Sequence, residues 1–303
     1  MSRHDLRLQE TSTPPPRRTL LAVHAHPDDE TITMGGTLAH YAAAGRRTVV
    51  VTCTRGDQGE IADQRLATRA TLGAVRGREL AEACRILGVA RLVQLGYGDS
   101  GMAGTGGDAA PGSFCRADVD EVTARIVALI REERPEVVVA YDETGGYYHP
   151  DHVRAHQVAV ASVGRAGDPD YGRPAGPPWS PPRMYFVVFP ESWSARFVER
   201  LRHASIAAPL SAAAGADAGT TIASFGVPDD RVTTAIDTSG FVAVKRAALA
   251  AHRTQMPPDH FLMRMPGDVA RELWAREWFH RERPPRDRQD GLEDDLFPTT
   301  AAT

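Results

Sequence analysis

From residue 19 onward the chain alternates short apolar runs with amphipathic segments. Short apolar runs without polar alternation are typical of parallel strands that are buried on both faces. Such runs, each bounded by turn residues, occur at 19–25, 47–54, 91–97 and 135–142. We therefore predict four buried parallel strands in the first half of the chain.

Helical periodicity occupies the segments between these runs. Apolar residues recur at helical spacing in 34–45, 76–87 and 118–133, and Gly45 and Gly88 are placed to end the first two helices. Strands that alternate with helices at short spacing predict an α/β fold with a Rossmann-like, mostly parallel sheet and helices on both faces. In such a sheet the ligand site lies beyond the carboxyl ends of the strands.

The second half of the chain has a weaker pattern. The remaining predicted elements are strands at 184–190 and 231–237, a helix at 238–255, a surface loop at 211–220 and a helix with Trp274 and Trp278 on its core-facing side. Residues 1–18 contain three consecutive prolines and are expected to be a flexible lead-in, and the polar, acidic residues 283–303 are expected to be a disordered tail. A single catalytic domain at 19–282 remains.

Composition narrows the class of function. The 303 residues are 42% hydrophobic and 24% charged, which is ordinary for a globular protein, and the net charge of −4 argues against a nucleic-acid partner. The sequence offers neither a transmembrane run nor the apolar stretch of a signal peptide, and its three cysteines lack metal-finger spacing. We expect a cytoplasmic protein with a small-molecule partner and no membrane partner, and the oligomeric state is left open.

Two polar clusters follow predicted strands. HAHPDDE spans 24–30 and YYHPDH spans 147–152. Either Asp28 or Asp29 alone could be a helix cap or a turn residue. Two His-Pro-Asp clusters at the same edge of a sheet instead favour a metal site, because Zn²⁺ takes nitrogen and carboxylate ligands and hydrolysis needs additional acids and bases beside it. His24 alternates with His26 and should point to the opposite face.

The two clusters resemble the signatures of a known family. AHPDDE at 25–30 and HPDH at 149–152 are similar to the motifs of the LmbE-like (PIG-L) N-deacetylases, and the likeness runs from about residue 20 to 161. These are zinc-dependent enzymes on a Rossmann-like fold that act on N-acetylglucosaminyl conjugates and related amides. The resemblance therefore implies a hydrolase with one bound Zn²⁺, and Fe²⁺ is an alternative for the same ligands.

The resemblance also implies a role for each residue of the clusters. The implied metal ligands are His26, Asp29 and His152. The implied catalytic residues are Asp28 as the general base toward a metal-bound water, His149 for the oxyanion and the leaving amine, Asp151 to orient or tune His149, and Tyr147 to polarise the carbonyl. These roles agree with the chemistry, because a carboxylate can accept the proton of a metal-activated water and a histidine or phenol can donate to developing negative charge.

Further segments are similar to the mycothiol-pathway branch of this family. These segments are 76–80, 99–105 and 142–156. By resemblance, Arg76 and Asp99 would hold sugar or inositol hydroxyls, and Met102 would line the pocket. The expected activity is therefore hydrolysis of the N-acetyl group of an N-acetylglucosaminyl-inositol conjugate.

Alternatives remain open at this stage. Within the family they are a mycothiol S-conjugate amidase, which Thr33 disfavours because a lysine is expected there in that branch, and a secondary-metabolite N-deacetylase, which segment 256–279 resembles. A non-haem iron oxygenase would use His26, Asp28 and His152, but such enzymes are typically β-barrels. A catalytically inactive sugar-binding module should lack a ligand or the base, and this sequence lacks neither. His252 in the predicted helix at 238–255 could approach the site.

Overall fold

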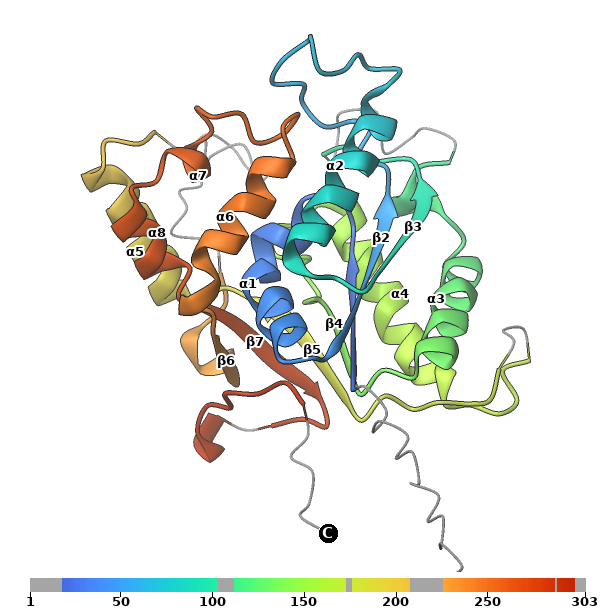
Figure 1. The fold of residues 1–303 in the computed structure, drawn as a ribbon. Helices are drawn as coiled ribbons and strands as arrows, with labels where there is room; N and C mark the ends of the chain where they lie inside the picture. The colour runs from blue at the N-terminus through green and yellow to red at the C-terminus, as the bar shows by residue number, and fades with distance from the viewer. Residues whose placement is uncertain (1–17, 103–111, 173–175, 208–225, 287, 298–303) are drawn as a thin grey trace, which may run out of the picture.

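The computed structural model describes residues 18–102, 112–172, 176–207, 226–286 and 288–297, and these residues form a seven-stranded sheet flanked by helices (Figure 1). The strands, in the spatial order β3-β2-β1-β4-β5-β7-β6, are β1 (Thr19–His24), β2 (Arg47–Thr54), β3 (Arg91–Tyr97), β4 (Val137–Tyr141), β5 (Arg183–Val188), β6 (Thr234–Asp237) and β7 (Arg276–Arg283). Neighbouring strands among β1 to β5 pair in parallel, and β7 runs antiparallel to β5 and β6. The predicted mostly parallel α/β sheet is confirmed.

Strands β1 and β4 lie side by side at the centre of the sheet. Every residue of both strands is buried, which explains their uninterrupted apolar sequences. The chain leaves β1 for β2 on one side and later places β4 on the other side of β1. This pair of strands is therefore a topological switch point, and their carboxyl ends form the edge where such sheets bind ligands.

Helices cover both faces of the sheet, as predicted (Figure 1). One layer contains α1 (Asp29–Ala43), α2 (Leu72–Leu87) and α6 (Val242–Ala251), and the other contains α3 (Val119–Glu133) and α4 (Pro150–Ala166). Three further helices, α5 (Glu191–His203), α7 (Phe261–Arg264) and α8 (Gly267–Leu273), follow the later strands.

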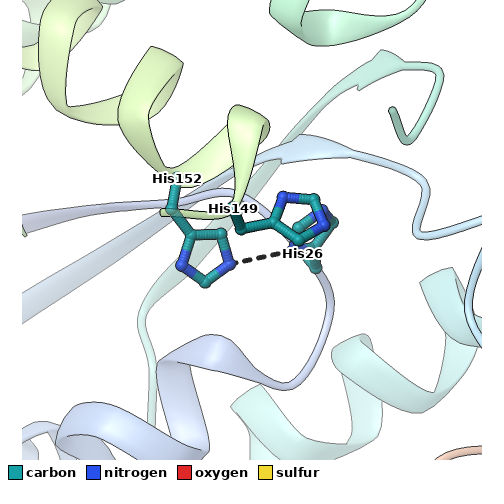
Figure 2. Close-up of side chains that lie close together, drawn as sticks. All are labelled: His26, His149 and His152. Atoms are coloured by element: carbon teal, nitrogen blue, oxygen red, sulfur yellow. Dashed lines mark hydrogen bonds between the residues drawn. The ribbon is translucent and has the colours of Figure 1, made fainter. Parts of the chain in front are cut away.

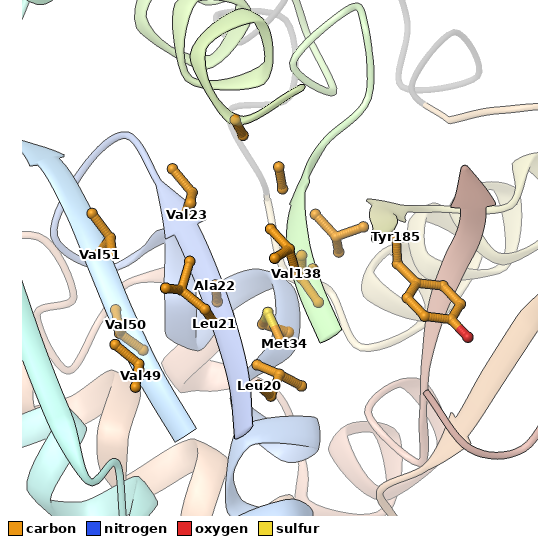
Figure 3. Packing of buried hydrophobic residues seen from close by; sticks show 14 of the residues in the cluster. Leu20, Leu21, Ala22, Val23, Met34, Val49, Val50, Val51, Val138 and Tyr185 are labelled. Atoms are coloured by element: carbon orange, nitrogen blue, oxygen red, sulfur yellow. The ribbon is translucent and has the colours of Figure 1, made fainter. Parts of the chain in front are cut away.

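The main hydrophobic core lies between the sheet and these helices (Figure 3). Leu21, Val50 and Val138 project from three adjacent strands and are fully buried, as is Met34 of α1. A second apolar cluster, which includes Trp274, joins α5 to α8 beside this core. The central strands are therefore fixed from both faces, which holds the residues at their carboxyl ends in place.

Two predicted helices differ from the structure. Helix α1 begins at Asp29 rather than at residue 34, because the acidic residues of the first cluster themselves form its first turn. The helix predicted through Trp274 and Trp278 is wrong: α8 ends at Leu273 and Trp278 lies in β7. A spacing of four residues also places two side chains on the same face of a strand, so this pair could not distinguish the two structures.

The predicted disordered tail requires a correction for residues 288–297. Leu296 and Phe297 are buried in the main core. The Glu293 carboxylate accepts hydrogen bonds from Arg281 at 2.7 Å and from Arg183 at 3.1 Å. An acidic residue of the segment that was expected to be disordered, Glu293, therefore pairs with two arginines of the sheet. Residues 1–17, 211–220 and 298–303 lie outside the described residues, and none of the described helices has the length and apolarity of a membrane span.

Candidate metal and catalytic site

A tight turn connects β1 to α1 and carries the first cluster. The backbone N–H of His26 donates to Asp29 Oδ2 at 2.7 Å across this turn. Asp28 has φ of 123° and ψ of −27°, a conformation that costs an L-residue about 1–3 kcal/mol. The strained turn gives the adjacent Asp28 and Asp29 carboxylates different neighbours, as the contacts described below show.

The second cluster forms the start of α4. His149 is the N-cap and Pro150 the first helical residue, so His152 lies in the first turn. His152 Nδ1 lies 3.0 Å from the carbonyl oxygen of Gly145, and its ring stacks on Tyr141. A Cβ at Gly145 would lie 2.5 Å from His152 Cβ, so this close approach requires glycine. Nδ1 is thereby the donor to the carbonyl, and the Nε2 lone pair is left for a metal ion.

Three donor atoms from the two clusters form a nearly equilateral triangle. His26 Nδ1 and His152 Nε2 lie 3.1 Å apart (Figure 2), and Asp29 Oδ2 lies 3.4 Å from each of these nitrogens. A tetrahedral ion with bonds of about 2.0–2.2 Å separates its donors by roughly 3.3–3.6 Å. Two edges of the triangle fall in this range and the third is slightly shorter, so its donors could hold a divalent ion.

Electrostatics favour the ligand-competent forms of Asp29 and His152 and a positive charge on His26. Burial alone would raise the pKa of Asp29, but His152 and His26 outweigh it and hold that pKa well below its usual range. Burial lowers the pKa of His152 to about 4. Burial also opposes a charge on His26, yet Asp99 and Asp151 raise its pKa well above the usual value. The pocket thus favours a positive charge at its centre, which a divalent ion would supply.

The outer nitrogen of His26 contacts two more carboxylates. Nε2 lies 3.2 Å from Asp151 Oδ2 and 3.5 Å from Asp99 Oδ1. A carboxylate on the far nitrogen of a liganding histidine fixes its tautomer and increases its basicity. This arrangement leaves His26 Nδ1 as the metal donor. Two buried groups have ligand atoms within 4.8 Å of one another, and both contain His149: one is His26, His149 and His152, and the other is His26, Asp99, His149 and Asp151.

Asp28 faces Arg76 rather than the histidines. Its Oδ2 lies 3.1 Å from Arg76 Nη2, and burial, partly offset by Arg76, raises the pKa of Asp28 to about 6. A carboxylate with this pKa can accept a proton near neutrality. Arg76 is buried, and its Nη1 and Nη2 also donate to the carbonyl oxygens of Gly56 at 2.7 Å and Pro27 at 2.6 Å. Its guanidinium therefore contacts the turn between β1 and α1. A contact between Arg76 and a substrate hydroxyl stays a prediction.

The other two predicted substrate residues share one loop. Asp99 is buried, and its carboxylate accepts the backbone N–H of Gly101 at 2.8 Å and that of Gln58 at 3.3 Å. Burial opposes a low pKa, but His26 outweighs it and keeps Asp99 ionised. Met102 is half-buried on the same loop, beside the segment 103–111 that lies outside the described residues. Their roles toward substrate stay predictions.

His149 lies beside His26 and His152 (Figure 2), and its hydrogen bonds define its tautomer. Its Nδ1 accepts the backbone N–H of Asp151 at 3.2 Å. Burial, together with His26 and His152, lowers its pKa to about 3, so the ring is neutral and Nε2 carries the proton. The Asp151 carboxylate, expected to orient His149 or tune its pKa, contacts His26 and Ser100. Its negative charge acts to raise the pKa of His149, against the larger effect of burial. The main chain of Asp151 is the part that orients His149.

Two tyrosines complete the wall around His152. The Tyr147 hydroxyl lies 3.5 Å from His152 Nε2, and burial raises its pKa, so the phenol remains a proton donor. The Tyr141 hydroxyl accepts the backbone N–H of Ala25 at 3.0 Å, and its ring centroid lies 4.3 Å from that of His152. Sequence reasoning missed Tyr141, because it reads as the last apolar residue of a buried strand.

Glu30 and His252 were also without an assigned role. Both are fully buried, and His252 Nε2 lies 2.9 Å from Glu30 Oε1. Burial acts to raise the pKa of Glu30, but His252 outweighs it and the pKa is lowered. Burial acts to lower the pKa of His252, but Glu30 outweighs it and the pKa is raised. Glu30 belongs to the first cluster, which was a signal for it, whereas nothing in the local sequence pairs it with His252. His24 is buried as well, and neither of its ring nitrogens has a hydrogen-bond partner among the described residues.

Comparisons with known proteins identify relatives of this chain. Residues 21–163 match the family model described as "PIG-L: GlcNAc-PI de-N-acetylase". A 1D-myo-inositol 2-acetamido-2-deoxy-alpha-D-glucopyranoside deacetylase from Geodermatophilus obscurus is 40% identical over 93% of this chain and 98% of that protein. A protein of the same name from Streptomyces scabiei is 42% identical over 92% of this chain and 88% of that protein.

A solved structure shares the fold. The N,N'-diacetylchitobiose deacetylase from Pyrococcus horikoshii has a TM-score of 0.59 at 21% identity, covering 87% of this chain and 83% of that one. The α/β sheet also differs from the β-barrels on which non-haem iron oxygenases are typically built. The identity to the two bacterial relatives, over nearly the whole chain, goes beyond a shared fold, and this chain belongs to the GlcNAc-PI de-N-acetylase (PIG-L) family.

Proposed function

We propose that this protein is a zinc-dependent deacetylase that hydrolyses the N-acetyl group of an N-acetylglucosaminyl-inositol conjugate to a free amine and acetate. The observation that carries the proposal is the triangle of His26, Asp29 and His152 donors with the separate carboxylate of Asp28 beside it. The names of relatives at about 40% identity support the substrate class.

The metal would be held by His26 Nδ1, His152 Nε2 and Asp29 Oδ2. The donor set of two imidazoles and one carboxylate suits zinc, and the same set also accepts Fe²⁺. When bound, the ion would act as a Lewis acid toward the amide carbonyl and lower the pKa of a water molecule. Asp151 and Asp99 would hold His26 in the liganding tautomer through its Nε2.

Asp28 would be the general base. Its raised pKa of about 6 means that at pH 7 it is mostly ionised, yet basic enough to take a proton from the attacking water. Asp29, with its lowered pKa, would instead remain a ligand throughout. The opposite pKa shifts of these two adjacent carboxylates thus match two different tasks.

His149 and Tyr147 would stabilise the negative charge that develops on the carbonyl oxygen. His149 presents a proton on Nε2, because its Nδ1 accepts the Asp151 N–H. The Tyr147 hydroxyl stays protonated and lies next to His152. These two neutral donors beside the donor triangle would form the oxyanion site. Proton delivery from His149 to the leaving amine stays a prediction from the family resemblance.

The test is amine release by protein that has been stripped with a chelator and reloaded with Zn²⁺ or Fe²⁺. We expect metal-dependent release from N-acetylglucosaminyl-inositol and much slower release from N-acetylglucosamine. Preferred cleavage of a mycothiol S-conjugate, or release only from a larger acylated metabolite, would replace the substrate part of the proposal with the corresponding alternative. Equal release without metal would overturn the mechanism.

A further inference from the structure

Both polar groups of the peptide bond between Pro27 and Asp28 form hydrogen bonds with side chains. The Pro27 carbonyl oxygen accepts a hydrogen bond from Arg76 Nη2 at 2.6 Å. The Asp28 N–H donates to Glu30 Oε2 at 3.0 Å. These two contacts hold the peptide plane that gives Asp28 its φ of 123°.

Glu30 is itself fixed from the far end of the chain. Its Oε1 lies 2.9 Å from His252 Nε2 and also accepts from the Thr31 hydroxyl. Glu30 and His252 are each fully buried, so solvent does not compete for these contacts. His252 directly follows α6, which packs on α1 and α2. The last part of the domain therefore reaches the turn that carries Asp28.

The left-handed conformation of Asp28 would relax if this peptide rotated. A flip of the Pro27–Asp28 peptide plane returns φ of Asp28 to the ordinary negative range and leaves Cβ of Asp28 nearly in place. The carboxylate would shift through Arg76, because the guanidinium that contacts Asp28 Oδ2 at 3.1 Å would lose the Pro27 oxygen. Such a flip would turn the Asp28 N–H away from Glu30 and the Pro27 oxygen away from Arg76. Glu30 and Arg76 thus hold a conformation that the backbone alone disfavours.

We propose that Glu30, fixed by His252, is a positioning residue that keeps the Asp28 backbone in its left-handed conformation and so aims the Asp28 carboxylate at the reacting water. The inference rests on the proposed role of Asp28 as the base. This role differs from that of a helix cap, because a residue that only capped α1 would stabilise the helix without affecting turnover.

The first test compares Glu30→Ala with Glu277→Ala. Glu277 is a matched control: it too is a buried carboxylate that accepts N–H groups of α1, at Gly36 and Thr37, and it pairs with Lys245 at 2.7 Å. Glu30→Ala should lower kcat by about 100-fold, the order of loss that a misplacement of 1 Å produces, with KM changed by less than about threefold and one zinc per chain retained. Glu277→Ala should lower the unfolding temperature and leave kcat unchanged.

A double-mutant cycle separates positioning from stability. Because Glu30 acts through Asp28, Glu30→Ala should change the residual rate of an Asp28→Ala protein by less than about twofold. An equally large loss in both backgrounds would overturn the positioning role. If Asp28→Ala abolishes turnover while Glu30→Ala keeps a normal kcat, the positioning role alone fails. If Asp28→Ala turns over normally, the proposed base fails as well.

His252 supplies a second route in case Glu30→Ala does not fold. His252→Ala should lower kcat by about tenfold with zinc content unchanged, because Glu30 loses the donor that fixes it. His252→Gln, whose amide nitrogen can occupy the position of Nε2, should restore kcat to within about threefold of the wild type. Normal kcat in His252→Ala, or no recovery in His252→Gln, would overturn this assignment.

Discussion

At the scale of single residues, two neighbours in the sequence have pKa values shifted in opposite directions, because they contact different residues from distant parts of the chain. Asp28 and Asp29 are adjacent, yet burial, partly offset by Arg76, raises the pKa of Asp28 to about 6. His152 and His26 outweigh burial for Asp29 and hold its pKa well below the usual range. The two motifs were enough to predict which side chains gather. They could not predict the protonation states, because these depend on residues far away in the sequence.

A substitution of Arg76 can distinguish two roles of this residue: holding the turn between β1 and α1, and binding substrate hydroxyls. Arg76→Lys replaces a planar fork by a single ammonium, which cannot hold both Pro27 and Gly56 in the same way. We expect kcat to fall by about tenfold or more with little change in KM, measured on N-acetylglucosaminyl-inositol. A rise in KM with normal kcat would instead support the predicted contact with substrate hydroxyls.

Tyr148 carries backbone strain that its side chain does not offset. It has φ of 64°, and its side chain is 70% exposed. An L-residue in this region costs about 1–2 kcal/mol, which glycine avoids at some cost in unfolded-state entropy. Tyr148→Gly should therefore raise the free energy of unfolding by up to about 1 kcal/mol in urea titrations, whereas Tyr148→Ala, which keeps a Cβ, should give no gain. Equal effects of the two substitutions would refute this explanation.

At the scale of elements, apolar runs predicted the strands better than periodicity predicted the helices. Strand β2 has the predicted bounds, because a strand buried on both faces has little freedom in sequence. Helix α1 begins earlier than predicted, since its first turn consists of site residues whose polar character resembles a loop. The spacing of Trp274 and Trp278 suits both a helix and a strand. The segment with Trp278 is a strand, β7, because it pairs with β5 and β6.

Helix α1 contains two adjacent glycines with different surroundings. A Cβ on Gly36 would lie 2.6 Å from Thr238 Cβ, whereas the nearest atom to a Cβ on Gly35 would be Thr31 Cγ2 at 3.3 Å. Gly36→Ala should destabilise the protein by about 1–3 kcal/mol through overpacking. Gly35→Ala should be nearly neutral, because better helix propensity offsets the tighter contact. Thermal unfolding of both variants checks this, and a larger loss for Gly35→Ala would contradict it.

At the scale of the whole molecule, topology determines which motifs meet. His26 and His152 are far apart in the chain but follow neighbouring strands, so the sequence could predict their proximity. The sequence allowed His252 to approach the site, but not its pairing with Glu30. This pairing and the burial of Leu296 and Phe297 depend on tertiary contacts that leave no periodic signal. Composition alone suggested disorder where Glu293 in fact joins Arg183 and Arg281.

A half-buried carboxylate joins one helix layer to the sheet and should make the free energy of unfolding depend on pH. Glu133 of α3 accepts from Arg47 at 2.7 Å and from Arg91 at 2.5 Å, and the hydrogen bond from Arg47 is the main cause of its lowered pKa. A lowered folded-state pKa contributes stability above the unfolded value of about 4.3, and this contribution is lost as pH falls through the folded value. Because both arginines are partly exposed, Glu133→Gln should cost only about 1 kcal/mol at pH 7.

Urea titrations of the Glu133→Gln protein and the wild type across pH 3 to 7 check this dependence. The difference between their free energies of unfolding should shrink below about pH 4. A difference that stays constant or grows toward low pH would contradict the assignment.

The central claim is that one metal ion is held by His26, Asp29 and His152 and that Asp28 is the base beside it. The most direct measurement combines zinc content with amine release for Asp28→Ala and His152→Ala. The account predicts that Asp28→Ala keeps one zinc per chain and loses turnover by about 10³-fold or more, whereas His152→Ala loses both the zinc and the activity. Near-normal turnover in Asp28→Ala, or stoichiometric zinc in His152→Ala, would contradict it.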